Sequence, residues 1–321
     1  MKKLIAVLLS LVLVLSMLPA CNNSGDGKYV IGICQLMEHD ALSAATQGFK
    51  DAVVEALGEG NVEFKTEIAA GDSTLCSSIV LDFVSEEVDL ILANATPALQ
   101  AAAAATKDIP ILGTSITEYG VALGIDNFDG TVGGNVSGTS DLAPLDQQAA
   151  MVKEWFPEAE TVGLLYCAAE PNSKYQVDTV QGYLETLGYS CKQYSFSSTS
   201  DMEAVTRDAA SNSDVIYVPT DNTVAEGTGI ISGICLPMGV PVIAGEQGIC
   251  SGCGVATLSI SYYDLGVATG KMAAKILKGE ADISEMPVEY AADFQSLYNA
   301  EICAELDLKV PEGYTAIKTD E

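Results

Sequence analysis

The stretch TVGLLYCAAEPNSKYQ, from Thr161 to Gln176, decides the fold that this sequence predicts. Its first half, Val162 to Ala168, is a continuous apolar run, which is typical of a parallel strand buried on both faces. The polar segment 170–173 ends that run, and apolar residues at helical spacing follow. Asn172 or Ser173 is a good N-cap, so the helix presents free N–H groups and the positive end of its dipole. Open α/β sheets bind anionic ligand groups where a buried strand leads into such a helix.

The same alternation of strand and helix extends on both sides of this stretch and forms two arrays. The first array spans residues 29–113 and the second spans residues 145–244, with the glycine-rich segment 114–144 between them. The strands are too apolar to be amphipathic, which indicates parallel sheets covered by helices on both faces. We therefore predict an α/β protein with two doubly wound parallel-sheet lobes joined by a multi-stranded hinge.

The N-terminus has the pattern of an export signal. Lys2 and Lys3 precede an apolar run from Leu4 to Leu18, which is short for a membrane span but typical of a signal-peptide core. The run ends in LPAC, which resembles a bacterial lipobox and implies Cys21 as the lipid-modified first residue. An ordinary secretory signal, with Cys21 incidental, is the alternative. We predict an extracytoplasmic protein that is lipid-anchored to the outer face of the cell membrane.

The expected divisions of the chain follow from these patterns. The chain after Gly254 is expected to cross back between the lobes and to complete the hinge. The divisions are a lipoprotein signal peptide at 1–20, a lipidated tether at 21–28, a first lobe at 29–140 with 256–287, and a second lobe at 141–255 with 288–321.

Composition excludes several classes of function. The formal net charge is −29, from 44 acidic and 15 basic residues, so the chain lacks the basic face that nucleic-acid binding needs. Arg207 is the single arginine of the sequence, so no arginine cluster can clamp a phosphate. His39 is the single histidine, and no Gly-x-Ser-x-Gly elbow or dinucleotide fingerprint is present. We therefore expect no catalytic residues and no cofactor.

A metal site is also not expected. Cys250 and Cys253 form half of a zinc or redox motif, but the sequence has no second ligand pair at a matching spacing. Most other cysteines lie in apolar runs, where a cysteine behaves as a small hydrophobic residue.

Four stretches resemble a known family. They are GTSDLAP at 138–144, YCAAEPNS at 166–173, PTDNTVAEG at 219–227 and ISYYDLGVATGKMAAKIL at 260–277. Together they resemble the substrate-binding lipoproteins of ABC importers that include the tryptophan- and tyrosine-binding proteins of Gram-positive bacteria. The resemblance implies a type-I periplasmic-binding-protein fold, no catalysis, and capture of a small ligand such as tryptophan, tyrosine or phenylalanine. It also implies a permease and an ATPase as partners, and we expect a monomer. A sensor of the same fold and a secreted enzyme are the alternatives.

The candidate site residues follow strands, because ligands of open α/β sheets lie outside the carboxyl ends of the strands. Ser140 is added on the resemblance alone. The candidates are Gln35, Met37, Thr96, Ser115, Ser140, Tyr166, Glu170, Asn172, Ser173, Asp221, Asn222 and Glu246.

An amino-acid ligand brings a carboxylate and an ammonium, and each needs a partner. Without arginine, the carboxylate must go to hydroxyl and amide groups and to helix N-termini, for which Thr96, Ser115, Asn172 and Ser173 are placed. Thr96 and Ser173 could instead be helix caps only.

The ammonium needs an anion, and Asp221 at the end of an apolar strand is the first choice. Glu246 is the second choice and Glu170 the third. The alternative for Asp221 is that it is a turn residue whose side chain only caps the next helix. Tyr166, Met37, Tyr119 and Tyr262 could form aromatic or thioether walls for the ligand ring, although each one alone fits an ordinary core position.

The lipid anchor is tested by Cys21→Ala. We expect this variant to be released as mature protein or to remain an unprocessed precursor, because the thiol that would carry the lipid is gone. Membrane fractionation of cells that express each form measures the result. A variant that is processed and retained on the membrane like the parent would contradict the lipoprotein assignment.

Overall fold

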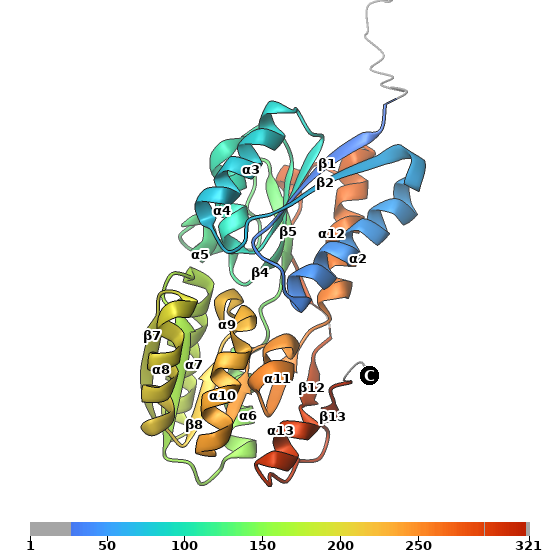
Figure 1. Cartoon of the computed structure of the whole chain (residues 1–321). Coiled ribbons are helices and arrows are strands. Elements are labelled where there is room, and N and C mark those ends of the chain that lie inside the picture. Colours follow the sequence, from blue (N-terminus) through green and yellow to red (C-terminus); the bar gives the residue numbers. More distant parts are fainter. Residues whose placement is uncertain (1–26, 292, 319–321) are drawn as a thin grey trace, which may run out of the picture.

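The computed structural model describes residues 27–291 and 293–318. These residues form two α/β lobes, with the first above the second in Figure 1 and the connecting segments on one side. The expected signal peptide and most of the expected tether, with Cys21, lie outside the described residues. Within 27–291 and 293–318, no helix has the length and apolar character needed to cross a membrane.

The first lobe is a parallel sheet with helices on both faces. Its strand order is β11-β5-β4-β3-β1-β2. One core packs the sheet against α3 and α4, and a second packs the opposite face against α2 and α12. The strands are β1 (Tyr29–Gln35), β2 (Val62–Ile68), β3 (Leu90–Asn94), β4 (Ile111–Ile116), β5 (Val136–Ser140) and β11 (Glu289–Tyr290). The helices are α2 (Asp40–Leu57), α3 (Ser73–Ser85), α4 (Thr96–Ala105), α5 (Tyr119–Leu123) and α12 (Tyr262–Leu277), with short 3₁₀ turns at Glu59–Asn61 and Ile283–Glu285.

The second lobe repeats this architecture. Its strand order is β13-β12-β10-β9-β8-β6-β7, and β10 and β12 are antiparallel. One core lies under α6 and α7, and another lies under α8 and α10. The strands are β6 (Thr161–Cys167), β7 (Ser190–Phe196), β8 (Val215–Val218), β9 (Val242–Ala244), β10 (Ala256–Ser259), β12 (Gln295–Tyr298) and β13 (Thr315–Ala316). The helices are α6 (Leu145–Trp155), α7 (Pro171–Thr186), α8 (Thr199–Ser211), α9 (Asn222–Glu226), α10 (Thr228–Met238), α11 (Gln247–Cys253) and α13 (Ala300–Glu305).

The predicted fold class is confirmed, but the pairing of strands differs from two of the expected divisions. Residues 256–259 form β10 in the sheet of the second lobe, whereas the sequence analysis placed them in the first. Residues 289–290 form β11 beside β5 of the first lobe, whereas they were expected in the second. Apolar patterning marks a segment as a buried strand, but it does not say which of two sheets receives the strand.

Two expected helix boundaries are also wrong. The helix after β6 begins at Pro171 with Glu170 as its N-cap, so neither Asn172 nor Ser173 is the cap residue. Proline suits the first helical position because its fixed φ is already helical and its missing N–H would have no partner there. The sequence pattern predicts one continuous helix at 223–237, whereas the structure has two helices there, α9 and α10, which meet at Gly227.

Helices α2 and α12 lie in close backbone contact along one face of the first lobe (Figure 1). A Cβ atom at Gly266 would lie 2.0 Å from the carbonyl oxygen of Ala45, and one at Gly48 would lie 2.1 Å from that of Tyr263. Only glycine permits this approach, since any side chain would force the two backbones apart. The pair therefore forms one rigid unit, which holds the N-termini of both helices at the edge that faces the second lobe.

The close packing is tested by Gly266→Ala. We expect it to lower the free energy of unfolding by about 1–3 kcal/mol, because the added methyl group overpacks the contact with α2. Gly233→Ala on α10 is the matched control, since nothing lies within 4 Å of a Cβ there. The control should be stabilising by about 0.5–1 kcal/mol, the usual helical preference for alanine over glycine. Urea unfolding measures both, and equal effects of the two substitutions would contradict a rigid α2–α12 unit.

Candidate ligand-binding site

The carboxyl ends of the strands in the two sheets face each other across a narrow cleft. Its innermost part, here called the inner chamber, has a volume of about 10 Å³. That is about the space of one water molecule, so the two lobes are closed on each other. Both lobes line the inner chamber, with His39, Ala41, Leu42, Ser115, Thr117, Asp141 and Tyr262 from the first and Asn172, Thr220, Asp221, Asn222, Ala225 and Glu246 from the second.

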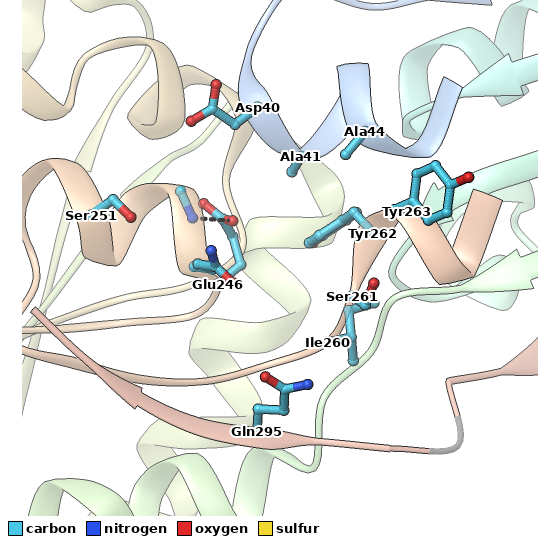
Figure 2. Close-up of a pocket in the computed structure, with 12 residues that line it drawn as sticks. Asp40, Ala41, Ala44, Glu246, Ser251, Ile260, Ser261, Tyr262, Tyr263 and Gln295 are labelled. Atoms are coloured by element: carbon cyan, nitrogen blue, oxygen red, sulfur yellow. Dashed lines mark hydrogen bonds between the residues drawn. The ribbon is translucent and has the colours of Figure 1, made fainter. Parts of the chain in front are cut away.

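A larger cavity, the outer chamber, adjoins the inner one beside the hinge. Its volume is about 330 Å³, and it shares Ala41, Glu246 and Tyr262 with the inner chamber. Figure 2 shows Asp40, Ala41 and Ala44 of α2 on one side and Ser251 of α11 on another, with Gln295 extending from β12. The remaining residues that line it are Gln247, Gly248, Ile260, Ser261 and Tyr263.

The structure brings several of the predicted site residues to the inner chamber. Ser115 comes from the first lobe, while Asn172, Asp221, Asn222 and Glu246 come from three loops of the second. All three loops follow parallel strands at the same edge of the sheet, as expected for this architecture.

The other predicted residues line neither chamber. Gln35 donates to the carbonyl of Met37 at 2.8 Å, and Met37 packs in a core of the first lobe. Thr96 is buried in the first turn of α4. Ser140 Oγ donates to the carbonyl of Thr117 at 2.9 Å, and the hydroxyl of Tyr166 donates to Gln193 Oε1 at 3.1 Å. Each of these side chains supports the strand ends from inside a lobe.

Glu170 and Ser173 lie directly behind the chamber wall. The Glu170 carboxylate accepts from the backbone N–H of Asn222 at 3.1 Å and from that of Thr223 at 2.8 Å. The side-chain amide of Asn222 and the hydroxyl of Thr223 also donate to it. The Asn172 amide donates to Glu170 at 3.2 Å and to Ser173 Oγ at 3.3 Å. Glu170 therefore fixes the loops that carry Asn172 and Asn222.

Asp221 acts as a helix cap, the alternative that the sequence analysis left open. One of its carboxylate oxygens accepts from the backbone N–H of Val224 at 2.9 Å, and the other accepts from that of Cys167 at 2.7 Å. Burial, followed by the nearby Glu170 charge, raises the pKa of Asp221 to about 8. Its carboxylate borders the inner chamber, but both oxygens already have backbone donors.

Glu246 has a comparable position at the N-terminus of α11. Its carboxylate accepts from the backbone N–H groups of Gly248 and Ile249. Burial raises the pKa of Glu246 to about 7. The side chain is 3% exposed and lies where the two chambers join.

Asp141 also lines the inner chamber, and it was not among the residues predicted from the sequence. It follows β5, and one carboxylate oxygen accepts from the hydroxyl of Tyr262 at 3.0 Å. The other oxygen has no hydrogen-bond partner within 3.5 Å, although the side chain is only 4% exposed and the Thr117 hydroxyl lies close enough to lower its pKa. Burial raises the pKa of Asp141 to about 6. The sequence does contain Asp141, in the GTSD stretch. The glycine-rich pattern of segment 114–144 does not predict strand β5, so it gives no sign that Asp141 follows the end of a strand.

The inner chamber gathers buried polar atoms that lack partners. They are Ser115 Oγ, Asp141 Oδ1 and Asn172 Oδ1. The Asn172 amide is oriented by its NH₂ group, which donates to Glu170 Oε2, so the oxygen is the atom left without a partner. Buried polar groups are nearly always paired in folded proteins, and a cluster of exceptions around one cavity indicates a ligand that pairs them.

The charges around both chambers are almost all negative. No lysine or arginine is among the residues that line either chamber in the described chain. Burial lowers the pKa of His39, so the imidazole is neutral, and its Nε2 lies 3.2 Å from Asn222 Oδ1 of the opposite lobe. Within 27–291 and 293–318, no three His, Cys, Asp or Glu side chains are grouped to hold a metal ion. Cys250 and Cys253 are buried, and burial raises the pKa of both thiols.

The N-terminus of α2 also faces the inner chamber. Its N-cap residue, His39, makes no side-chain cap hydrogen bond, whereas α11 and α12 are capped by Glu246 and Ser261. The first N–H groups of a helix have no intrahelical partners, so an uncapped terminus can receive an anionic group.

Comparison with known proteins supports this reading of the cleft. A family model described as ABC transporter substrate binding protein matches residues 30–319. The tyrosine-binding protein of Clostridioides difficile is 34% identical over 100% of this chain and 97% of its own length. A solved ABC domain from Streptococcus pneumoniae in complex with L-Trp is 31% identical, with a TM-score of 0.86 over 91% of this chain and 100% of that one.

A third relative is more identical in sequence than the L-Trp complex but less similar in overall structure. The ligand-free, open structure of a substrate-binding protein with adhesive properties from Clostridium difficile is 37% identical, and covers 91% of this chain and 100% of that one. Its TM-score is only 0.70, below that of the less identical L-Trp complex. The overall arrangement of this chain is therefore more similar to that of the L-Trp complex than to that of the open, ligand-free structure.

These matches extend over nearly all of the sequence, and the two-lobed α/β architecture is like that of solved periplasmic binding proteins. Proteins of this kind bind solutes outside the cytoplasm and do not catalyse a reaction. The chain belongs to the family of ABC transporter substrate-binding proteins.

Proposed function

We propose that this protein captures an aromatic amino acid, tyrosine or tryptophan, between its two lobes and delivers it to an ABC importer. The observation that carries the proposal is the set of unpartnered acceptors, Asp141 Oδ1 and Asn172 Oδ1, in an acidic inner chamber. An ammonium group supplies three N–H donors and a positive charge, which is what these atoms lack. The tyrosine-binding relative and the relative in complex with L-Trp support the choice of ligand class.

Asp141 is the proposed main partner of the ammonium. Unlike Asp221 and Glu246, it has a carboxylate oxygen without a donor, and its other oxygen is oriented by Tyr262. A buried carboxylate without a counter-charge is costly, so the ligand ammonium would remove that cost. Asp221 and Glu246 would add negative potential from the opposite lobe.

The ligand carboxylate would lie at the N-terminus of α2. That terminus is uncapped and faces the inner chamber, and Ser115 Oγ in the same wall has no partner. Backbone N–H groups and a hydroxyl can hold a carboxylate without arginine.

The aromatic ring would occupy the outer chamber. Its volume of about 330 Å³ is in the range of small-molecule pockets. Ala41, Ala44 and Ile260 supply apolar walls, while Tyr262 points from α12 toward Glu246 in Figure 2 and offers an aromatic surface.

Ligand entry would require the lobes to separate, since the closed inner chamber admits about one water molecule. Three segments connect the lobes, after β5, after β10 and after β11, and they would form the hinge. The contact between His39 and Asn222 joins the lobes in the closed state. A lipid on Cys21 would hold the protein beside its permease and ATPase.

The role of Asp141 is tested with Asp141→Asn. We expect the affinity for L-tyrosine or L-tryptophan to fall by roughly 2–5 kcal/mol, since the variant keeps the shape but removes the charge that pairs with the ammonium. Isothermal titration calorimetry measures the change. Asp208→Asn on the exposed face of α8 is the matched control and should bind like the parent. An unchanged affinity in Asp141→Asn, with a large loss in Asp221→Asn, would show that Asp221 is the ammonium partner.

The affinity should also fall as the pH decreases from 8 to 5. Burial raises the pKa of Asp141 to about 6, of Glu246 to about 7 and of Asp221 to about 8, so all three carboxylates take up protons over this range. Protonation removes negative charge from the cleft, so it weakens the attraction for an ammonium. Titrations at several pH values measure the dependence. It should be shallower in Asp141→Asn, and a constant affinity from pH 5 to 8 would contradict the proposed ammonium site.

A further inference from the structure

The two charged groups of an amino acid meet very different surroundings in this cleft. Four carboxylates line the chambers, from Asp40, Asp141, Asp221 and Glu246, and none of the lining residues is a lysine or arginine. Asp141, Asp221 and Glu246 are 1–4% exposed, so water screens them little. Where these groups are ionised, which for Asp221 and Glu246 requires a pH above their raised pKa values of about 8 and about 7, the potential in the cleft favours a cation and opposes an anion.

The ammonium finds acceptors that nothing else in the described chain uses. Asp141 Oδ1 and Asn172 Oδ1 are both buried and unpartnered on the walls of the inner chamber. They belong to different lobes, so a group that bridges them also favours the closed state.

The carboxylate finds only neutral donors, and few of them. The N-termini of α11 and α12 are already capped by the side chains of Glu246 and Ser261. The uncapped N-terminus of α2 carries Asp40 in its first turn, which places a negative charge at the same end of the helix. Ser115 Oγ remains as an unpartnered hydroxyl. Attraction to these donors is offset by repulsion from the surrounding carboxylates.

We infer that the cleft binds arylalkyl amines without a carboxylate, such as tyramine, with an affinity within about thirtyfold of that for the corresponding amino acid. This inference rests on the proposed function and extends its ligand class from amino acids to primary aromatic amines. The ammonium and the ring carry the recognition, and the carboxylate is tolerated.

The test compares three ligands that differ by one charged group. L-tyrosine has both groups, tyramine lacks the carboxylate, and 3-(4-hydroxyphenyl)propionate lacks the ammonium. We expect tyramine to bind within about thirtyfold of tyrosine, a margin equal to one charge-assisted hydrogen bond. The propionate should bind more weakly than tyramine by at least about a hundredfold, since it leaves the buried acceptors unpaired. Calorimetric titration of the full mature protein gives all three affinities.

Two variants separate the groups that hold each end of the ligand. Ser115→Ala removes a hydroxyl that we assign to the ligand carboxylate. It should lower the affinity for tyrosine and leave the affinity for tyramine unchanged. Asp141→Asn should weaken tyrosine and tyramine by the same factor, because both carry the ammonium. Thermal unfolding of each unliganded variant checks that it is folded.

The outcomes distinguish this inference from the proposed function. If tyrosine binds and the affinity for tyramine is more than about thirtyfold lower, the inference is overturned and the amino-acid function is kept. Tyramine binding without tyrosine binding would support the inference and overturn the amino-acid function. If neither bound, or if the propionate bound better than tyramine, the inference would be wrong.

Discussion

The cost of burying carboxylates at the carboxyl ends of strands governs how this cleft is built. A buried charge must find hydrogen-bond donors, and helix N-termini supply backbone N–H groups at the same edge of each sheet. Glu170, Asp221 and Glu246 all meet this requirement by accepting from the first N–H groups of α9 or α11. These bonds fix the loops of the second lobe before any ligand arrives. Asp141 is the exception, because one of its oxygens receives no donor from the described chain.

This difference separates acids that hold the protein together from one that is available to a ligand. Each oxygen of the capping carboxylates Asp221 and Glu246 is held by a backbone N–H group, and removal of either carboxylate would leave those N–H groups unpaired. The Asp141 carboxylate accepts one hydrogen bond, from the Tyr262 hydroxyl, and its other oxygen has no hydrogen-bond donor at the cleft. A ligand that meets this need stabilises the closed arrangement, because the other unpartnered acceptor, on Asn172, belongs to the opposite lobe.

The packing of α2 on α12 places the first-lobe part of the site. Glycine at 48 and 266 lets the two backbones approach, so the start of α2 and the start of α12 lie together at the edge of the lobe. Tyr262 is thereby positioned beside Asp141, which is 121 residues away in the sequence. Because the hinge segments leave from the same region, closure of the lobes and completion of the site are one movement.

The sequence by itself determined the two-array α/β fold and the edge at which a ligand would bind, because apolar strands and the polar loops after them are local patterns. It also predicted site roles for five residues that the structure places around the inner chamber, namely Ser115, Asn172, Asp221, Asn222 and Glu246. Only the tertiary structure decided that residues 256–259 join the second sheet and that Asp141 is the carboxylate with an unpaired oxygen. Strand partners and hydrogen-bond donors come from distant parts of the chain, and no local pattern records which acid will find a donor and which will not.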